Sequence, residues 1–122
     1  MAEEKKQTVV SFPAHEEILL ATIECAELDE DRTKQMQNEI MNAATTRPQV
    51  PVVLDLAKVT FLPSLSIGAL VSFLTYFKQL GRRFILVGIQ PPIRDMLAIT
   101  RLDKIFEMYD NRDDAIEKIR QA

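Results

Sequence analysis

Cysteine and histidine are almost missing from the sequence, which has one of each among its 122 residues. The single cysteine, Cys25, leaves no partner for an intramolecular disulfide, and its apolar surroundings at residues 18–25 predict a small buried hydrophobe. One histidine and one cysteine are too few for the usual zinc cluster of these residues. A Ser-His-Asp triad would need His15, which lies beside two glutamates and is expected on the surface. The sequence therefore predicts no metal site and no catalytic residue.

Glycines, basic clusters and long apolar runs are also scarce. The three glycines, Gly68, Gly81 and Gly88, lack the spacing of a phosphate loop or a dinucleotide fingerprint, so no cofactor is expected. The net charge of −3 comes without a basic block, which disfavours nucleic-acid binding. No apolar run approaches the roughly 20 residues of a membrane span, and no signal core follows the N-terminus. These features predict a cytoplasmic, non-enzymatic chain without direct membrane insertion.

The length of the chain and the order of its patterns predict a single α/β domain. We expect this domain at residues 9–120, after a flexible polar N-terminus at residues 1–8. Apolar runs predict strands near residues 9–12, 18–25, 50–56, 84–87 and 105–109. Capping signals predict helices after Asp29, at residues 65–80 before Gly81, after the pair Pro91 and Pro92, and after Asp110 or Asn111. Strands alternating with helices from residue 50 onwards are typical of parallel βαβ units.

The segment before the helix at residues 65–80 is the most informative part of the chain. Pro63 lacks an N–H and favours an extended backbone at Leu62, so the helix should begin close to Ser64. Ser64 then falls at or beside the N-cap, and Ser66 lies in the first turn. One interpretation is a plain capping serine. The other is an exposed site for protein interaction or phosphorylation.

The same helix carries more apolar surface than a helix packed on one face of a sheet needs. Its apolar residues fall on two adjacent arcs at about 100° per residue: Ile67, Leu70, Val71, Leu74 and Phe77 on one, and Leu65, Ala69, Phe73, Tyr76 and Leu80 on the other. Only a narrow polar strip remains, made of Gly68, Ser72, Thr75 and Gln79. The excess apolar surface is either covered by a neighbouring helix or left free for a partner.

Several motifs, taken in order, resemble the signature of the STAS domain family. They are Ala26-Glu27-Leu28-Asp29, Val53-Leu54-Asp55-Leu56, Val59-Thr60-Phe61-Leu62, Ser64, Ile67-Gly68-Ala69-Leu70, Gly81 through Val87, and Pro92 through Phe106. The resemblance covers roughly residues 9–120. It implies a STAS-like α/β fold, with a central mixed sheet of about four to five strands and about four helices.

Within this family, the chain resembles the bacterial anti-anti-sigma factors. That resemblance implies a protein-binding regulator that sequesters an anti-sigma kinase of the GHKL type and releases it when a serine is phosphorylated. Ser64 matches the phosphoacceptor position. Partner contacts are expected around the start of the helix, at Asp29, Leu62, Pro63, Ser64, Leu65, Ser66 and Gly68.

Two departures from the family pattern leave an alternative open. Pro63 stands where the family usually has Asp, and Ser66 stands where it usually has Gly. Pro63 favours a constitutive subunit of a transporter ATPase or a signalling scaffold, whereas Ser64 favours the phosphorylation switch. A small α/β enzyme is a third reading, which the scarcity of histidine and of glycine-rich loops disfavours.

Overall fold

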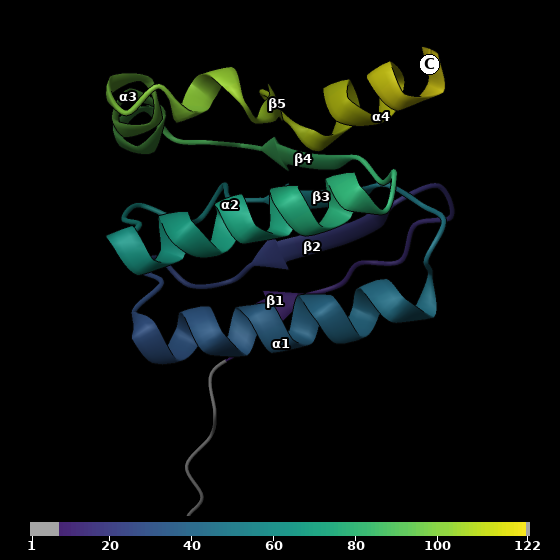
Figure 1. Cartoon of the computed structure of the whole chain (residues 1–122), viewed down its shortest axis with the longest axis horizontal. Coiled ribbons are helices and arrows are strands. Elements are labelled where there is room, and N and C mark those ends of the chain that lie inside the picture. Colours follow the sequence, from purple (N-terminus) through teal and green to yellow (C-terminus); the bar gives the residue numbers. More distant parts are fainter. Residues whose placement is uncertain (1–7, 122) are drawn as a thin grey trace, which may run out of the picture.

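A five-stranded mixed sheet lies at the centre of residues 8–121, the part of the chain that the computed structural model describes (Figure 1). Its strands lie side by side in chain order: β1 (Val10–Ser11), β2 (Leu19–Ile23), β3 (Val52–Asp55), β4 (Phe84–Val87) and β5 (Glu107–Tyr109). β1 is antiparallel to β2, and every later pair is parallel. The expected α/β fold with a mixed sheet is therefore confirmed. Of the segment expected to be flexible, residues 1–7 lie outside the described residues.

Four α-helices accompany these strands within the described residues: α1 (Glu30–Thr46), α2 (Ser64–Gln79), α3 (Pro91–Ile99) and α4 (Arg112–Gln121). The first three connect successive parallel strands. Because such crossovers share one hand and each strand lies next to the previous one, their helices fall on the same face of the sheet. Figure 1 shows α1 and α2 running side by side across that face. α4 follows the last strand and contacts β3, β4 and β5.

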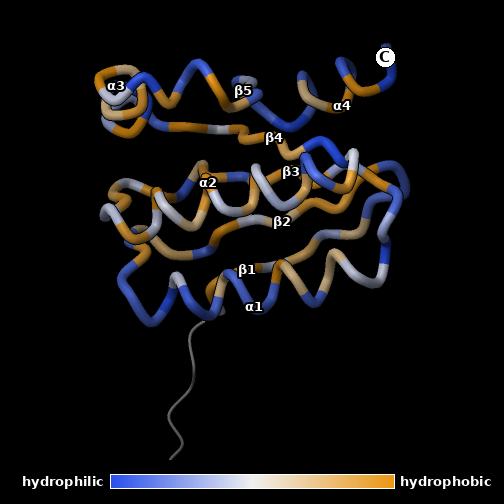
Figure 2. The backbone as a smooth tube through the Cα atoms, in the orientation of Figure 1, coloured by the Kyte–Doolittle hydropathy of each residue, from blue (hydrophilic) through white to orange (hydrophobic). Residues whose placement is uncertain are grey.

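Alternation along the strands divides the buried side chains into two cores. Leu54 and Leu86 are fully buried in the larger core, beneath α1 and α2. Val53 and Ile85, their neighbours in the chain, belong to a second core with Ala115 of α4. Both faces of the central strands are thus covered, which explains why β3 and β4 read as continuous apolar runs. Figure 2 shows these strands as the apolar centre of the molecule.

The strand predicted at residues 105–109 is wrong at its start. A 3-10 turn, η1 (Leu102–Lys104), separates α3 from β5, and the strand begins only at Glu107. η1 follows Arg101, whose φ of 63° is left-handed and turns the chain. Ile105 is left 48% exposed, while Phe106 is buried in the larger core. The apolar run therefore includes a turn that an average over hydrophobicity does not detect.

Two arginines fasten the edge of the sheet where the parallel strands begin. Arg82 precedes β4 and donates hydrogen bonds to the carbonyl oxygens of Val50, Ala44 and Arg47, at 3.0, 3.1 and 2.9 Å. Arg47 donates in turn to three carbonyl oxygens within residues 15–18, which lead into β2. These bonds join the C-terminal end of α1 to the entries of three strands. None of these six bonds uses a carboxylate.

The outer strand β5 is attached through a charged cluster. Arg83 donates two hydrogen bonds to the carboxylate of Glu107, and the hydroxyl of Tyr109 donates a third at 2.6 Å. Burial raises the pKa of Glu107, but the hydrogen bonds from Arg83 and Tyr109 outweigh it, so the pKa lies below its ordinary value of 4.5. Glu107 is therefore held in its charged form.

This cluster makes part of the stability depend on pH. A carboxyl whose pKa is depressed by folding stabilises the protein above its unfolded pKa, and that stabilisation is lost as the pH falls through the folded pKa. We expect Glu107→Gln to lower the free energy of unfolding at neutral pH and to weaken its decline in acid. Urea denaturation from neutral pH into the range below the ordinary pKa of 4.5 measures both effects. Glu117→Gln, an exposed change on α4, is the control. If Glu107→Gln and the wild type lose the same unfolding free energy as the pH falls, the prediction is contradicted.

Candidate functional site

The loop from β3 to α2 is anchored at its start, at the edge where the parallel strands end. Asp55, the last residue of β3, is buried; its Oδ1 accepts a hydrogen bond from the Ala57 backbone N–H at 2.9 Å. Its Oδ2 lies 3.2 Å from the guanidinium of Arg112 at the start of α4. Gly88 has a φ of +71°, and a Cβ there would lie 3.0 Å from Asp55 Oδ1. The loop thus starts from a fixed carboxylate with α4 on one side and β4 on the other.

The loop delivers Ser64 to the surface as the first residue of α2. Pro63 occupies the N-cap with a φ of −67° and a ψ of 167°, and it supplies no side-chain hydrogen bond to the helix. Ser64 is exposed. Its predicted accessibility at a helix N-terminus is confirmed, whereas its interpretation as the capping residue is wrong because Pro63 holds that position. The free N–H groups of the first turn and the helix dipole favour negative charge here.

Ser66, two residues further along the first turn of α2, is fully buried. Its hydroxyl donates to the carbonyl oxygen of Leu28 at 2.7 Å and lies 2.8 Å from the hydroxyl of Thr33 on α1. Thr33 also donates to the Leu28 carbonyl, at 3.2 Å. The Ser66 side chain therefore joins α2 to α1 and offers no surface for the expected direct contact with a partner. Leu62, also named as a contact, is buried in the larger core apart from a small part that faces a cavity.

Removing this internal bond should measurably destabilise the fold. Ser66→Ala would leave the Leu28 carbonyl with the longer bond from Thr33 only, and it would deprive the Thr33 hydroxyl of a neighbour. We expect a loss of about 0.5–1.5 kcal/mol in the free energy of unfolding, the usual net contribution of one intramolecular hydrogen bond. Ser72→Ala, on the exposed side of the same helix, should change it by less than about 0.5 kcal/mol. Equal denaturation midpoints for both variants would show that the Ser66 contacts do not stabilise the fold.

The surface around Ser64 is mainly apolar. A cavity of about 170 Å³ opens beside it, lined by Leu62, Ser64, Ile67, Met96 and Thr100. Phe61 and Leu65, on either side of Ser64 in the chain, are 55% and 50% exposed. Large apolar side chains left in water around one polar group are typical of a protein-binding surface.

Two other predicted contacts, Asp29 and Gly68, are exposed. Asp29 is the N-cap of α1, as predicted, and accepts the backbone N–H of Arg32 at 2.9 Å. Gly68 has no atom within 4 Å of the place of a Cβ, so packing does not require a glycine there. Both residues are available to a partner, and their role in binding stays a prediction.

Sequence reasoning missed Phe61, Met96 and Thr100 as parts of this surface. Phe61 was assigned only to a motif, whereas in the structure it pairs with Glu27 in an isolated parallel bridge and its side chain is exposed. Met96 lies on α3 and Thr100, four residues later, is its C-cap, so the two side chains lie on the same side of that helix. Nothing in the sequence indicates that this face borders α2.

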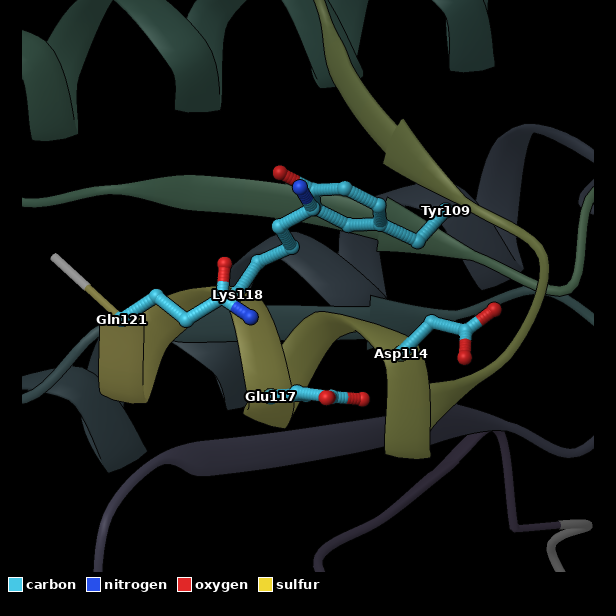
Figure 3. A pocket seen from close by; sticks show the side chains of 5 residues that line it. All are labelled: Tyr109, Asp114, Glu117, Lys118 and Gln121. Carbon is cyan, nitrogen blue, oxygen red and sulfur yellow. The ribbon is translucent and has the colours of Figure 1, made fainter.

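A different hollow, of about 310 Å³, lies against α4 (Figure 3). Figure 3 shows its lining coming from β5 and α4: Tyr109, Asp114, Glu117, Lys118 and Gln121. None of these residues is a serine, cysteine or histidine that could form a nucleophile–base pair. Within residues 8–121, no group of three or more His, Cys, Asp or Glu side chains is arranged to hold a metal ion. Cys25 is buried as predicted, and burial raises the pKa of its thiol.

No helix among the described residues combines the length and apolar character that crossing a bilayer requires. The site consists of an exposed serine at the start of α2, an apolar surround and, beneath them, the buried hydrogen bonds of Asp55 and Ser66.

Comparison with known proteins places this arrangement in a family. The family model for the STAS domain matches residues 4–115. An anti-sigma F factor antagonist of Paenibacillus polymyxa is 24% identical over 110 residues, which is 90% of this chain and 93% of that protein. A candidate anti-sigma factor antagonist of Thermotoga maritima is 31% identical over 70 residues, or 57% of this chain. The alignments with the Thermotoga maritima protein and with its Thermotoga neapolitana homologue span about three fifths of the length of those two relatives.

A solved structure agrees in fold. The anti-sigma factor antagonist SpoIIAA, in its unphosphorylated form, superposes with a TM-score of 0.71 at 18% identity, over 93% of this chain and 99% of that one. Its likeness concerns the architecture of strands and helices. With the family model matched along nearly the whole chain and the mixed sheet in place, the chain belongs to the STAS domain family.

Proposed function

We propose that this chain is an anti-sigma factor antagonist, a non-enzymatic regulator that binds an anti-sigma factor and thereby frees a sigma factor. The observation that carries the proposal is the exposed Ser64 at the start of α2, set among exposed apolar side chains. Antagonists among the relatives support it, since the Paenibacillus protein aligns over 90% of this chain. The surface is suited to binding a protein and needs no cofactor.

We further propose that the partner is an anti-sigma kinase of the GHKL type and that Ser64 is its phosphoacceptor. A phosphoserine carries a charge of about −1.5 to −2 at neutral pH. At the first residue of a helix this charge meets free N–H groups and a favourable dipole, so the domain should stay folded. Release would follow because the charge and bulk lie within the interface. That SpoIIAA was solved in an unphosphorylated form supports a phosphorylated counterpart in this family.

The alternative is a constitutive STAS subunit of a transporter ATPase or signalling scaffold. Pro63 favours it, because this residue fills the N-cap without the acidic side chain that the family usually places beside the serine. In that case the same surface would bind a partner without a phosphorylation cycle.

Phosphate transfer distinguishes the two proposals. We expect a GHKL kinase encoded beside this chain to transfer radiolabelled phosphate to the wild type and not to Ser64→Ala. Pro63→Asp should raise the rate of labelling if the proline is what impairs recognition. Ser72→Ala, on the exposed side of α2, is the matched control and should be labelled like the wild type. Labelling that persists in Ser64→Ala, or stable binding without any label, would favour another acceptor or the constitutive subunit.

A further inference from the structure

One stripe of α2 borders two apolar hollows. Ile67 lines the cavity of about 170 Å³ beside Ser64, and Leu74 lines a wider hollow of about 520 Å³ that ends at Ile105. Seven residues separate Ile67 from Leu74, which is two helical turns, or about 10.5 Å along the axis. We call the two hollows, together with the stripe of α2 between them, the α2 groove. Its opposite wall comes from α3 and from the turn after η1, which Figure 1 shows on the α3 side of α2.

The rim of the α2 groove carries positive charge in a chain whose net charge is −3. Lys78 lines the wider hollow, and Lys104 and Arg101 come one and four residues before Ile105 in the chain. All three are exposed, and none forms an ion pair with another residue of the described range. The acidic groups of this wall are Asp95, which is exposed, and Asp103, which has one carboxylate oxygen enclosed without a partner. Arg94 is already paired with Asp110 at 3.5 Å.

We propose that the α2 groove binds an acidic amphipathic helix of the partner, with apolar side chains at positions i and i+7 in the two hollows. Helices that bind grooves use this spacing, which matches the two turns between Ile67 and Leu74. Acidic residues beside the apolar stripe would meet the cations of the rim. The inference rests on the proposed function, and it specifies which kind of element of the partner the α2 groove binds.

Ser64 gives the α2 groove a means of control. Its side chain lines the narrower hollow together with Ile67. A phosphate there would place negative charge at the end of a groove that holds an acidic helix, so repulsion would act on the bound segment. The fold would be unaffected, because the same phosphate lies at the start of α2 where negative charge is favourable.

A selection from phage-displayed helical peptides of about 18 residues, a length that supports helix formation, tests the proposal with the full chain as bait. We expect enriched peptides to be acidic, with apolar residues spaced by seven. Their affinity should fall about tenfold or more, at least about 1.4 kcal/mol, for the double variant Lys78→Glu/Lys104→Glu and for Ile105→Glu. Lys118→Glu on α4 and Leu80→Glu at the exposed end of α2 are the matched controls and should bind normally. Circular dichroism verifies that every variant is folded.

Enrichment of basic peptides, absence of enrichment, or equal binding to groove variants and controls would overturn the proposal. The kinase itself separates this outcome from failure of the proposed function. If the kinase binds Lys78→Glu/Lys104→Glu as tightly as the wild type but is released by Ser64→Asp, the groove inference fails and the function stands. If acidic peptides need the groove while no anti-sigma kinase binds, the function fails and the helix-binding groove stands.

Discussion

Ser64→Asp is expected to weaken binding of the anti-sigma kinase by a factor of about 30 to several thousand, which corresponds to about 2–5 kcal/mol. The reason is that a carboxylate at this exposed position would be enclosed in an interface whose surroundings are mainly apolar. The chain itself tolerates the change, because position 64 is the first residue of α2 and its side chain makes no capping bond. A binding titration measures the loss, and thermal unfolding should show little change.

Matched variants identify the cause of this loss. Ser64→Ala should bind at least as well as the wild type, since it adds neither charge nor bulk. Ser72→Asp adds the same charge on the exposed side of α2 and should leave affinity unchanged within experimental error. Equal binding by Ser64→Asp and the wild type, with no phosphate on Ser64, would exclude the phosphorylation switch and favour the constitutive subunit.

Leu54→Ala and Leu86→Ala should each cost about 2–5 kcal/mol of unfolding free energy. Both side chains are fully buried, and they lie opposite each other in the paired strands β3 and β4. Truncating either leaves a cavity under α1 and α2 that neighbouring strands cannot fill without moving. Because domains of this kind hold about 5–15 kcal/mol in total, either change could unfold a large fraction of the protein.

Urea denaturation followed by circular dichroism measures this effect. Leu80→Ala is the matched control, because Leu80 is 56% exposed just beyond α2 and should change stability by less than about 0.5 kcal/mol. If the denaturation midpoints of Leu54→Ala and Leu86→Ala match that of Leu80→Ala, these two leucines do not belong to the core.

The sequence predicted those parts of the fold whose signals are local. The strand at residues 84–87 has the predicted bounds because an apolar run is enclosed by Arg83 and Gly88, and both ends are sharp. Gly81 has a φ of +72°, as expected of the residue that follows a helix. The start of β5 was not predictable in this way. There the apolar Ile105 belongs to a turn. Only the path of α3 and η1 determines that Phe106, and not Ile105, is buried.

In the candidate site too, features with local sequence signals could be predicted, and features that depend on distant residues could not. The position of Ser64 could be inferred from Pro63, whose restricted backbone ends the loop and begins the helix. The burial of Ser66 could not, because it depends on Leu28 and Thr33, more than thirty residues earlier in the chain. The apolar excess of α2 was read correctly as a choice between a neighbouring helix and a free surface. The structure gives some of both, since α2 contacts α1 while Leu65 is exposed.

The arginine bonds at the entry edge of the sheet imply an uneven resistance to local opening. Arg82, at the entry to β4, and Arg47 bind carbonyl oxygens at the end of α1 and at the entries to β2 and β3, so no part of that edge can separate without breaking several bonds at once. The opposite edge, where Ser64 lies, consists of loops and helix starts. Amide protons that are hydrogen-bonded at that edge, such as those of Arg47 and Val52, should therefore exchange with solvent mainly through global unfolding, whereas those at residues 57–65 should exchange through smaller fluctuations. A regulator built in this way can adjust its binding loops to a partner while the other end keeps the sheet in register.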